Sequence, residues 1–549
     1  MTLHRISRIA YVKCIIAVAL LAGCGGSDAS VNPVPASNDA SAEAAPDTSI
    51  DAPTQQDVSI EPLPDTVVAD QHAPDAEAGS LDVEPPKDAA TAQCSNCHID
   101  HSAAFAAGKH AALSDGCLSC HANGLEHQAD PPNVQAALDH SIEGCAEKCH
   151  GDYKSSYLKD DGLKIGPYGG SAKTSKYLEF PKYQHLMGGH GFTLEYNEER
   201  GHGSMLKDHI EIKRKQNSAC LQCKSTPVAY LWNKERRGQI AFGKAVDWNA
   251  SVDKIKVIAP KTIDYGAGCN HCHDPHGASF RLVRGALVSA ILERGTDPYS
   301  TTNNVFPKSE SDLTAMMNER GTDGKYTAAA KRLAGTLTCS QCHVEYTCGQ
   351  GIDKPNGPVR DDFPWRKLSE LEGYYKTKYN LIQDWKHSGT GLPGIKAQHP
   401  ESEFFWSSKH ASVGATCADC HMPKTATGRS HWFSSPRKSP NETCGTCHTD
   451  PADRLTLATG IQTAVMTKAS AVEAALDAVL VKIEALASDP SFDQVKLAAA
   501  KDHFMRGLLW WEFTVVSENS AGFHNPTEAD ANLSFAASEA DAAKVLLGI

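Results

Sequence analysis

Aromatic residues are scarce in this chain, at 7% of its 549 residues, so the chain is long for its apparent side-chain core. Positive charge is also in deficit, because the formal net charge is −13 at neutral pH with histidine neutral. This balance argues against nucleic-acid binding, and any site for an anion must be locally positive. The apolar run Cys14–Ala22 is too short to span a bilayer.

Cysteine, by contrast, is abundant: sixteen of the 19 Cys fall in eight paired motifs. In C-x-x-C-H the two thiols form thioethers to the haem vinyl groups, and the histidine becomes the proximal iron ligand. Six motifs have this form: Cys94/Cys97/His98, Cys117/Cys120/His121, Cys269/Cys272/His273, Cys339/Cys342/His343, Cys417/Cys420/His421 and Cys444/Cys447/His448. A zinc ribbon does not require histidine after each second cysteine, so c-type haem is the better interpretation. Haems would then replace aromatic side chains as core filling.

Two motifs depart from this form. Cys145-Ala-Glu-Lys-Cys149-His150 has three residues between the thiols, and its alternative is a disulfide beside a surface histidine. Cys220-Leu-Gln-Cys223-Lys224 carries lysine where histidine is expected. An amine ligand must lose its proton before it binds a metal. The sequence thus predicts eight haem c groups, one of them with Lys224 as its proximal ligand.

Composition divides the chain into five parts. Residues 1–23 form a secretory signal that ends in Leu21-Ala22-Gly23-Cys24, which resembles a bacterial lipobox and implies lipidation of Cys24. The other parts are a disordered Ala/Pro/Asp-rich tether (24–92), a three-haem domain (93–180), a five-haem catalytic core (181–450) and a helical region (451–549). We expect helices at Leu455–Ala487, Asp489–Ser517 and Glu528–Leu547. The predicted fold class is mainly α, with little β, a haem-packed core and long C-terminal helices.

The region from about Gly188 to Pro526 resembles the pentahaem, ammonia-forming cytochrome c nitrite reductases, in which one C-x-x-C-K haem precedes four C-x-x-C-H haems. The three additional haems before it resemble the octahaem members. The resemblance implies reduction of nitrite to ammonium at the Lys224 haem, with hydroxylamine and sulfite as further substrates. It also implies a periplasmic or quinol-linked electron donor and a homo-oligomer, either a dimer or a trimer of dimers. Export to the periplasmic side of a bacterial envelope is expected, because c-type haem is attached outside the cytoplasm.

Two strings, C339-S-Q-C-H-V-E-Y346 and K396-A-Q-H-P-E401, match family segments that bind calcium and line the distal pocket. The implied calcium ligands are Glu345, Tyr346, Lys396 through its backbone oxygen, and Gln398. The implied catalytic residues are Lys224, Arg214, Tyr346 and His399. Arg214 lies twelve residues after His202, as in the family, and Arg200 is its alternative. Tyr346 and Cys348 correspond to a pair that is joined by a thioether in octahaem enzymes.

Seven distal ligands are expected for the seven haems that have a histidine on both sides. The resemblance implies His202, His410, His431 and His524. An internal repeat adds His110, because Lys109-His110-Ala precedes Cys117 as Lys409-His410-Ala precedes Cys417. His127 and His190 are predicted for the other two haems, and His101, His140 and His185 are the alternatives.

Two other functions stay open. One is reduction of a different small oxyanion, and the other is electron conduction by a multihaem protein tethered to the outer membrane. An octahaem hydroxylamine oxidase should carry histidine at all eight haems, so Lys224 argues against that activity. The V-E-Y and K-A-Q-H-P-E strings argue against a pure conduit, which needs neither an open iron nor acid–base groups.

Overall fold

The computed structural model describes residues 94–134, 144–145, 150–151, 171–194, 196–200, 202, 205, 221–226, 229, 266–298, 307–346, 350–351, 363–379, 382–426 and 428–549. These residues belong to one compact unit, 81–549. The predicted signal and tether lie outside the described residues, and so do Cys24, His140, Cys149, Arg214, Cys220 and Cys348.

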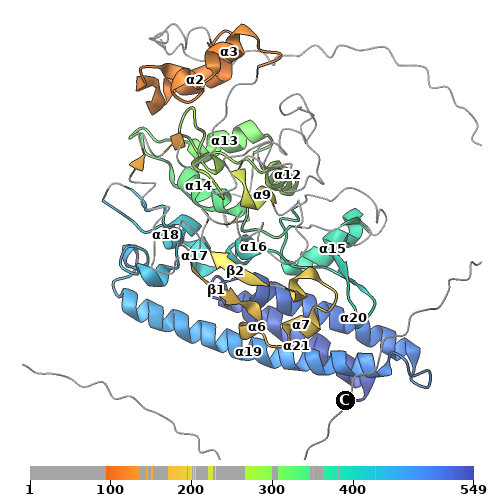
Figure 1. Ribbon diagram of the computed structural model, residues 1–549. Helices are drawn as coiled ribbons and strands as arrows, with labels where there is room; N and C mark the ends of the chain where they lie inside the picture. Colours follow the sequence, from red (N-terminus) through yellow and green to blue (C-terminus); the bar gives the residue numbers. More distant parts are fainter. Residues whose placement is uncertain are drawn as a thin grey trace, which may run out of the picture. The chain divides into compact units, whose positions relative to one another are not determined.

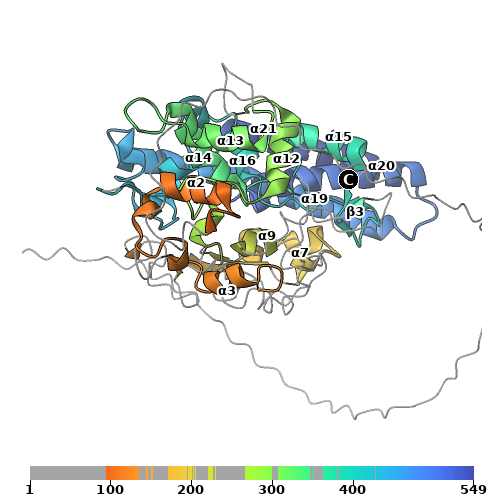
Figure 2. The same cartoon turned by 90° about the horizontal axis from the view of Figure 1, so that it is seen from above.

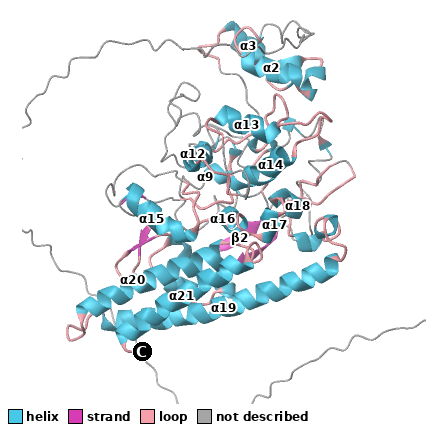
Figure 3. Cartoon of the chain, turned by 180° about the vertical axis from the view of Figure 1, so that it is seen from behind, coloured by secondary structure: helices cyan, strands magenta, loops and turns pink. Residues whose placement is uncertain are grey.

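Helices dominate the described structure (Figure 3), which confirms the predicted mainly α class. The strands form short antiparallel pairs: β1 (Ser171–Ser175) with β2 (Asn197–Arg200), β3 (Gln350–Gly351) with β4 (Ile382–Gln383), and β5 (Trp385–Lys386) with β6 (Pro393–Gly394). Thr174 is opposite Glu198 in the first pair, and Trp385 is opposite Gly394 in the third.

The α-helices before residue 300 are α2 (Ile99–Ala107), α3 (Gly124–Ala129), α6 (Lys176–Glu179), α7 (Tyr183–Leu186), α9 (Leu221–Lys224) and α12 (Gly285–Arg294). Those that follow are α13 (Glu310–Asn318), α14 (Ala328–Ser340), α15 (Leu368–Tyr379), α16 (Glu401–Phe405), α17 (Lys409–Ser412), α18 (Cys417–His421), α19 (Pro451–Leu486), α20 (Gln494–Trp511) and α21 (Pro526–Leu547). Short 3-10 helices cover Lys109–Ala112, Gly116–Ser119, Gly191–Thr193, Cys269–His271, Pro436–Lys438 and Cys444–Thr446, and a π-helical turn covers Glu512–Ser517.

The three C-terminal helices pack side by side (Figure 1) and confirm the helices predicted there. Asp450 caps α19, with its carboxylate accepting from the Asp453 amide at 2.9 Å, and proline follows the cap. Both features are typical of helix starts, since a cap accepts an amide hydrogen that has no partner within the helix. Leu476, Val479, Ala500 and other apolar side chains of these helices form a fully buried cluster.

A second apolar cluster joins α12, α13 and α14, and α13 lies beside α14 in both views (Figure 1 and Figure 2). Glycine at position 335 lets α14 approach α18 closely, because a Cβ atom there would lie 2.7 Å from the Thr416 hydroxyl. Thr416 and Asp419 form a capping box at the start of α18. The close approach brings the Cys339 and Cys417 motifs together.

The N-terminal part is built differently. Helix α2 buries none of its residues, and Gly124 is the buried residue of α3. Its short helices have no apolar cluster of their own among the described residues. Within the described part of the chain, no helix is both long and apolar enough to cross a membrane.

Candidate haem-binding and active site

Histidine rings lie in pairs at a nearly constant separation. Two imidazoles that bind opposite sides of one iron, each through a bond of about 2 Å, have ring centres roughly 6 Å apart. Six predicted proximal ligands each lie at this separation from a predicted distal ligand: His98–His127 (6.1 Å), His110–His150 (6.1 Å), His202–His343 (6.2 Å), His273–His431 (6.4 Å), His421–His524 (6.2 Å) and His410–His448 (6.4 Å). The residues present therefore fit haem between them.

The structure describes fourteen of the sixteen predicted haem-attaching thiols, all but Cys149 and Cys220. Cys223 is buried, and Cys447 Sγ lies 3.8 Å from the Thr446 hydroxyl.

Several of the paired rings are fixed through Nδ1. His110 contacts the Pro275 carbonyl at 2.8 Å, His127 the Val134 carbonyl at 2.6 Å, and His421 the Ser434 carbonyl at 3.0 Å. His524 contacts the Glu518 carboxylate at 2.6 Å. An oxygen at Nδ1 sets the tautomer and leaves Nε2 to bind a metal, as in most histidine–metal sites.

Burial favours the neutral form of several of these rings. Desolvation lowers the pKa of His202 to about 3 and that of His431 to about 4, with neighbouring positive groups acting in the same direction. The pKa of His421 is likewise lowered to about 4. Neutral imidazole is the form that binds iron, so these rings need no proton loss when haem is inserted.

His343 faces two candidate rings, His202 at 6.2 Å and His399 at 6.1 Å. Glu401 lies between His343 and His399, with Oε2 3.7 Å from Nδ1 of His343 and Oε1 3.9 Å from Nδ1 of His399. Burial lowers the pKa of His343, but the Glu401 carboxylate outweighs burial and raises it to about 9. His399 therefore lies on the side of the His343 ring that carries Nδ1. This leaves His202 as the ring that faces Nε2 of His343, the atom that would bind iron.

The lysine motif packs directly against the Cys339 motif. Cys342 Sγ lies 3.9 Å from the Cys223 carbonyl oxygen, and the fully buried Arg284 donates to Cys223 Sγ at 2.7 Å. The pKa of the Cys223 thiol is lowered to about 5, first by its hydrogen bond with Cys342 and then by the charges of Arg284 and His399. His399 thus acts at close range on the motif that carries Lys224.

One hydrogen bond joins the two predicted active-site strings. The Gln398 amide donates to Glu345 Oε2 at 2.7 Å, and Tyr346 and His399 are the next residues along the chain on each side. Tyr346 is buried and its ring lies 5.9 Å from that of Phe363, whereas the His399 side chain is 42% exposed. The structure therefore brings the predicted phenol and imidazole to one region beside Cys223.

The residues around Glu345 fit a calcium ion. Glu345 is fully buried, and its Oε1 accepts no hydrogen bond from the described residues. The Gln398 side-chain amide lies 3.2 Å from the Lys396 carbonyl oxygen, so two further predicted ligands meet nearby. Burial raises the pKa of Glu345, and the Glu403 and Glu512 carboxylates add to this effect, so a cation there would relieve a buried negative cluster. The described residues contain no cluster of three His, Cys, Asp or Glu side chains that could hold a metal, and this candidate set relies on carbonyl oxygens instead.

The π-helical turn Glu512–Ser517 supports the same segment from behind. The Ala397 amide donates to Glu512 Oε2 at 3.0 Å, and Lys396 Nζ forms a buried ion pair with Glu512. The Ser517 hydroxyl, which has one hydrogen to donate, lies 2.9 Å from the Ala397 carbonyl oxygen and 2.6 Å from a Glu512 carboxylate oxygen. These contacts fix the backbone that carries Gln398 and His399.

Other predicted histidines lie in different surroundings. His190 stacks on Phe192 with ring centres 5.1 Å apart, and its Nδ1 accepts from the Phe192 amide. His185, one of the alternatives, contacts Asp477 and Glu484 through its two ring nitrogens. Sequence reasoning missed Glu401 and Arg284, and it missed His276, whose ring lies 6.3 Å from that of His121.

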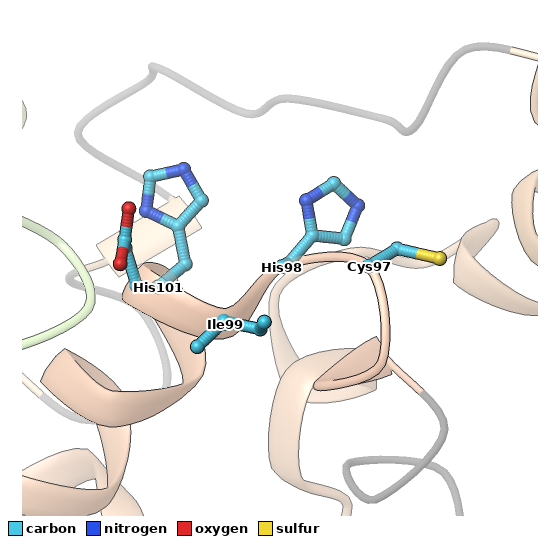
Figure 4. Close-up of a pocket in the computed structure, with 5 residues that line it drawn as sticks. Cys97, His98, Ile99 and His101 are labelled. Carbon is cyan, nitrogen blue, oxygen red and sulfur yellow. The ribbon is translucent and has the colours of Figure 1, made fainter. Parts of the chain in front are cut away.

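A cavity of about 380 Å³ adjoins the first motif and is lined by Cys97, His98, Ile99, Asp100 and His101. Its volume is typical of pockets that hold small molecules. Figure 4 shows the His98 and His101 rings rising from the same side of the chain. The His98 and His101 ring centres lie 6.2 Å apart, within the range of the other pairs. His127 is the better partner for His98, because Nδ1 of His127 is held by the Val134 carbonyl, whereas the His101 ring stacks on His276 with centres 4.6 Å apart.

The family model of cytochrome c552 matches residues 145–548. The chain belongs to the cytochrome c552 family. The match begins at Cys145, so the Cys94 and Cys117 motifs lie before the part that the chain shares with the cytochrome c552 family.

Individual relatives agree with this assignment. The chain is 30% identical over 384 residues to the cytochrome c nitrite reductase subunit NrfA of Nitratidesulfovibrio vulgaris, an alignment that covers 64% of this chain and 65% of the relative, just under two thirds of its length. It is 26% identical to cytochrome c-552 of Aliarcobacter butzleri, over 67% of this chain and 70% of that protein. The solved structure of cytochrome c nitrite reductase NrfA from Desulfovibrio desulfuricans, described with two calcium sites, has a TM-score of 0.60. It is 24% identical, covers 74% of this chain and 86% of that chain, and shares the fold.

Proposed function

We propose that this protein reduces nitrite to ammonium at a haem attached to Cys220 and Cys223 and held by Lys224. The observation that carries the proposal is the Gln398–Glu345 hydrogen bond, which joins the strings of Tyr346 and His399 next to Cys223. A relative named as a nitrite reductase subunit supports the same reaction. Reduction of hydroxylamine and sulfite at this site is part of the proposal, because both are small enough for the same pocket.

The proposed reaction joins one nitrite, six electrons and eight protons to give one ammonium ion and two waters. When bound, the haem would supply the electrons and the iron to which nitrite binds. Tyr346 and His399 would donate protons to the nitrite oxygens, and Arg214 would make the pocket positive, to which a bound calcium ion would add. Glu401 Oε1 lies 3.9 Å from Nδ1 of His399, beyond hydrogen-bond distance, and would form an ion pair with this ring when the ring is protonated. Glu345, Tyr346, Lys396 and Gln398 would hold the calcium and fix the loop that carries His399.

Seven further haems, each between two histidines, would bring electrons from a periplasmic or quinol-linked donor. The near contact of Cys342 with the Cys223 backbone supports transfer from the His343 haem into the Lys224 haem. We further propose an octahaem protein that is exported, anchored through a lipid at Cys24 and assembled as a homo-oligomer. A thioether between Tyr346 and Cys348 belongs to this proposal and would lower the pKa of the phenol.

Replacing Lys224 with histidine tests the mechanism. We expect Lys224→His to retain haem but to lose nitrite turnover by about tenfold or more, which corresponds to roughly 1.4 kcal/mol or more in activation free energy. Ammonium formed from nitrite by the purified protein with reduced viologen as electron donor provides the measurement. Lys325→His, in an exposed loop where the lysine side chain is 84% accessible, is the matched control and should keep full turnover. Normal turnover in Lys224→His would contradict the proposal, and wild-type protein that forms no ammonium would favour an electron conduit.

A further inference from the structure

We infer that His276 is the distal iron ligand of the haem attached to Cys117 and Cys120. The ring centres of His121 and His276 lie 6.3 Å apart. The six predicted proximal–distal pairs span 6.1 to 6.4 Å, so this seventh pair has the same spacing. The interplanar angle of 19° means that the two rings are nearly parallel, which allows both to point at a common centre. The inference concerns haem ligation and does not depend on the substrate that the catalytic haem reduces.

The second nitrogen of His276 is held as a metal ligand requires. Its Nδ1 lies 3.1 Å from Asp274 Oδ1, and its backbone amide donates to the same oxygen at 3.0 Å. A carboxylate at Nδ1 fixes the ring orientation and leaves Nε2 available to the iron. His524 has the same arrangement with Glu518, at 2.6 Å.

His101 and His190 are less suitable. The His101 ring stacks on His276 with centres 4.6 Å apart and an interplanar angle of 18°, which is too close for an iron between the two rings. His101 therefore covers one face of the His276 ring. His190 lies against Phe192 and Trp385, with its Nδ1 accepting from the Phe192 amide.

The loop around His276 is shaped for close packing against the N-terminal part. A Cβ atom on Gly108 would lie 3.0 Å from Gly277 Cα and 3.1 Å from the His276 carbonyl oxygen, so glycine permits this approach. Ala278 has φ of 57°, a left-handed conformation that a residue with a Cβ adopts at some cost in energy. Strained backbone of this kind persists where the surrounding structure over-determines it.

This loop would join three haems. His276 follows His273, the proximal ligand of a core haem, by three residues. The Pro275 carbonyl between them accepts from Nδ1 of His110, which lies 6.1 Å from His150. One loop thus contacts ligands of two N-terminal haems and adjoins a third in the core. Electrons collected by the N-terminal haems would enter the core here, and the iron–His276 bond would tie the two parts together.

The test compares three histidine variants of the full, haem-loaded protein in the oxidised state. We expect His276→Ala to keep its haem content by pyridine haemochrome assay while one haem changes from low spin to high spin. Because the Lys224 haem alone is expected to be high spin, the high-spin electron paramagnetic resonance signal should double. Added imidazole should return the new high-spin haem to low spin. His101→Ala and His190→Ala, the matched controls, should leave the signal unchanged.

A second variant covers the case in which His276→Ala does not accumulate. His276→Met supplies a different sixth ligand, so all the histidine-ligated haems should stay low spin while the potential of one haem rises in a spectroelectrochemical titration. An unchanged signal in His276→Ala, an unchanged set of potentials in His276→Met, or a doubled signal in either control would overturn the inference. Loss of nitrite reduction with intact spectra would count against the proposed function alone.

Discussion

The N-terminal segment that carries the first predicted haem motifs and the three C-terminal helices differ in what fills their interior. Along residues 94–134, Gly116 and Gly124 are the buried residues, and no apolar cluster forms. In α19, α20 and α21, side chains such as Leu476, Val479 and Phe504 are completely buried. A segment of about 40 residues cannot bury enough apolar surface to fold alone without metals or crosslinks. We therefore expect haem to fill the core of the first region, whereas side chains are the core of the second.

The contrast predicts opposite responses to loss of one haem, and this is the largest effect that we expect. Cys117→Ser combined with Cys120→Ser removes the covalent attachment of the haem. Amides in residues 94–134 should lose hydrogen-exchange protection by several orders of magnitude, since no apolar cluster remains to hold them. Hydrogen exchange read by mass spectrometry checks this. If the amides of residues 94–134 kept their hydrogen-exchange protection, or if α19, α20 and α21 lost as much, the two regions would not differ in the way that we expect.

A second experiment removes a core side chain from the C-terminal helices, which carry no haem motif. Leu476→Ala in α19 leaves a cavity in a fully buried cluster, and we expect it to lower the free energy of unfolding by about 2–5 kcal/mol. The haem absorption spectrum should stay unchanged. Denaturant unfolding followed by far-ultraviolet circular dichroism gives the measurement. Val481→Ala, at a position on the same helix that is 53% exposed, should cost far less, and equal losses in the two variants would argue against a side-chain core.

The smallest effect that we expect is a change in the pH dependence of stability caused by His185, a histidine that does not bind haem. His185 of α7 contacts Asp477 and Glu484 of α19; burial lowers its pKa, but the two carboxylates outweigh burial and raise it. A raised folded-state pKa gives stability that is fully present below about pH 6.5 and is lost as the pH rises through the folded value. His185→Gln should therefore lose stability at pH 6 more than at pH 8.5, by less than about 1 kcal/mol because the site is partly exposed.

Denaturant midpoints at the two pH values measure this difference. Lys468→Gln removes an ion pair of 2.5 Å between Lys468 of α19 and Asp530 of α21, and it should change stability equally at pH 6 and pH 8.5. The same pH dependence in wild-type protein and His185→Gln would show that His185 does not supply it.

The haem motifs and the C-terminal helices could be predicted because both depend on short spacing. Cys339, Cys342 and His343 lie within five residues, and buried apolar residues recur at spacings of three and four along α19 from Val465 to Leu486. The distal ligand of the Cys117 haem could not be predicted in this way. His121 and His276 are far apart in the chain, and their meeting depends on the approach of Gly108 to Gly277. Spacing did hold one signal, since His276 follows His273 as His101 follows His98.

In the active-site region, too, some residues could be predicted from the sequence and others could not. Glu345, Tyr346, Gln398 and His399 could be named from two strings that resemble a known family. Glu401 was the last letter of one string, yet its position between His343 and His399 required the fold. Arg284 lies in a stretch of sequence without a motif and reaches Cys223 only because its segment packs against the lysine motif. Contacts between distant segments set both positions.

The π-helical turn has a consequence for how this protein tolerates changes in chain length. Glu512 and Ser517 are five residues apart, and they converge on the 396–397 backbone because this turn is wider than an α-helical one. Removing a single residue from the turn would rewind it into regular helix and rotate one anchor away from the other. Many substitutions on the outer face of α19 should be harmless, whereas a one-residue deletion in this turn should not, even though no residue within it meets the substrate.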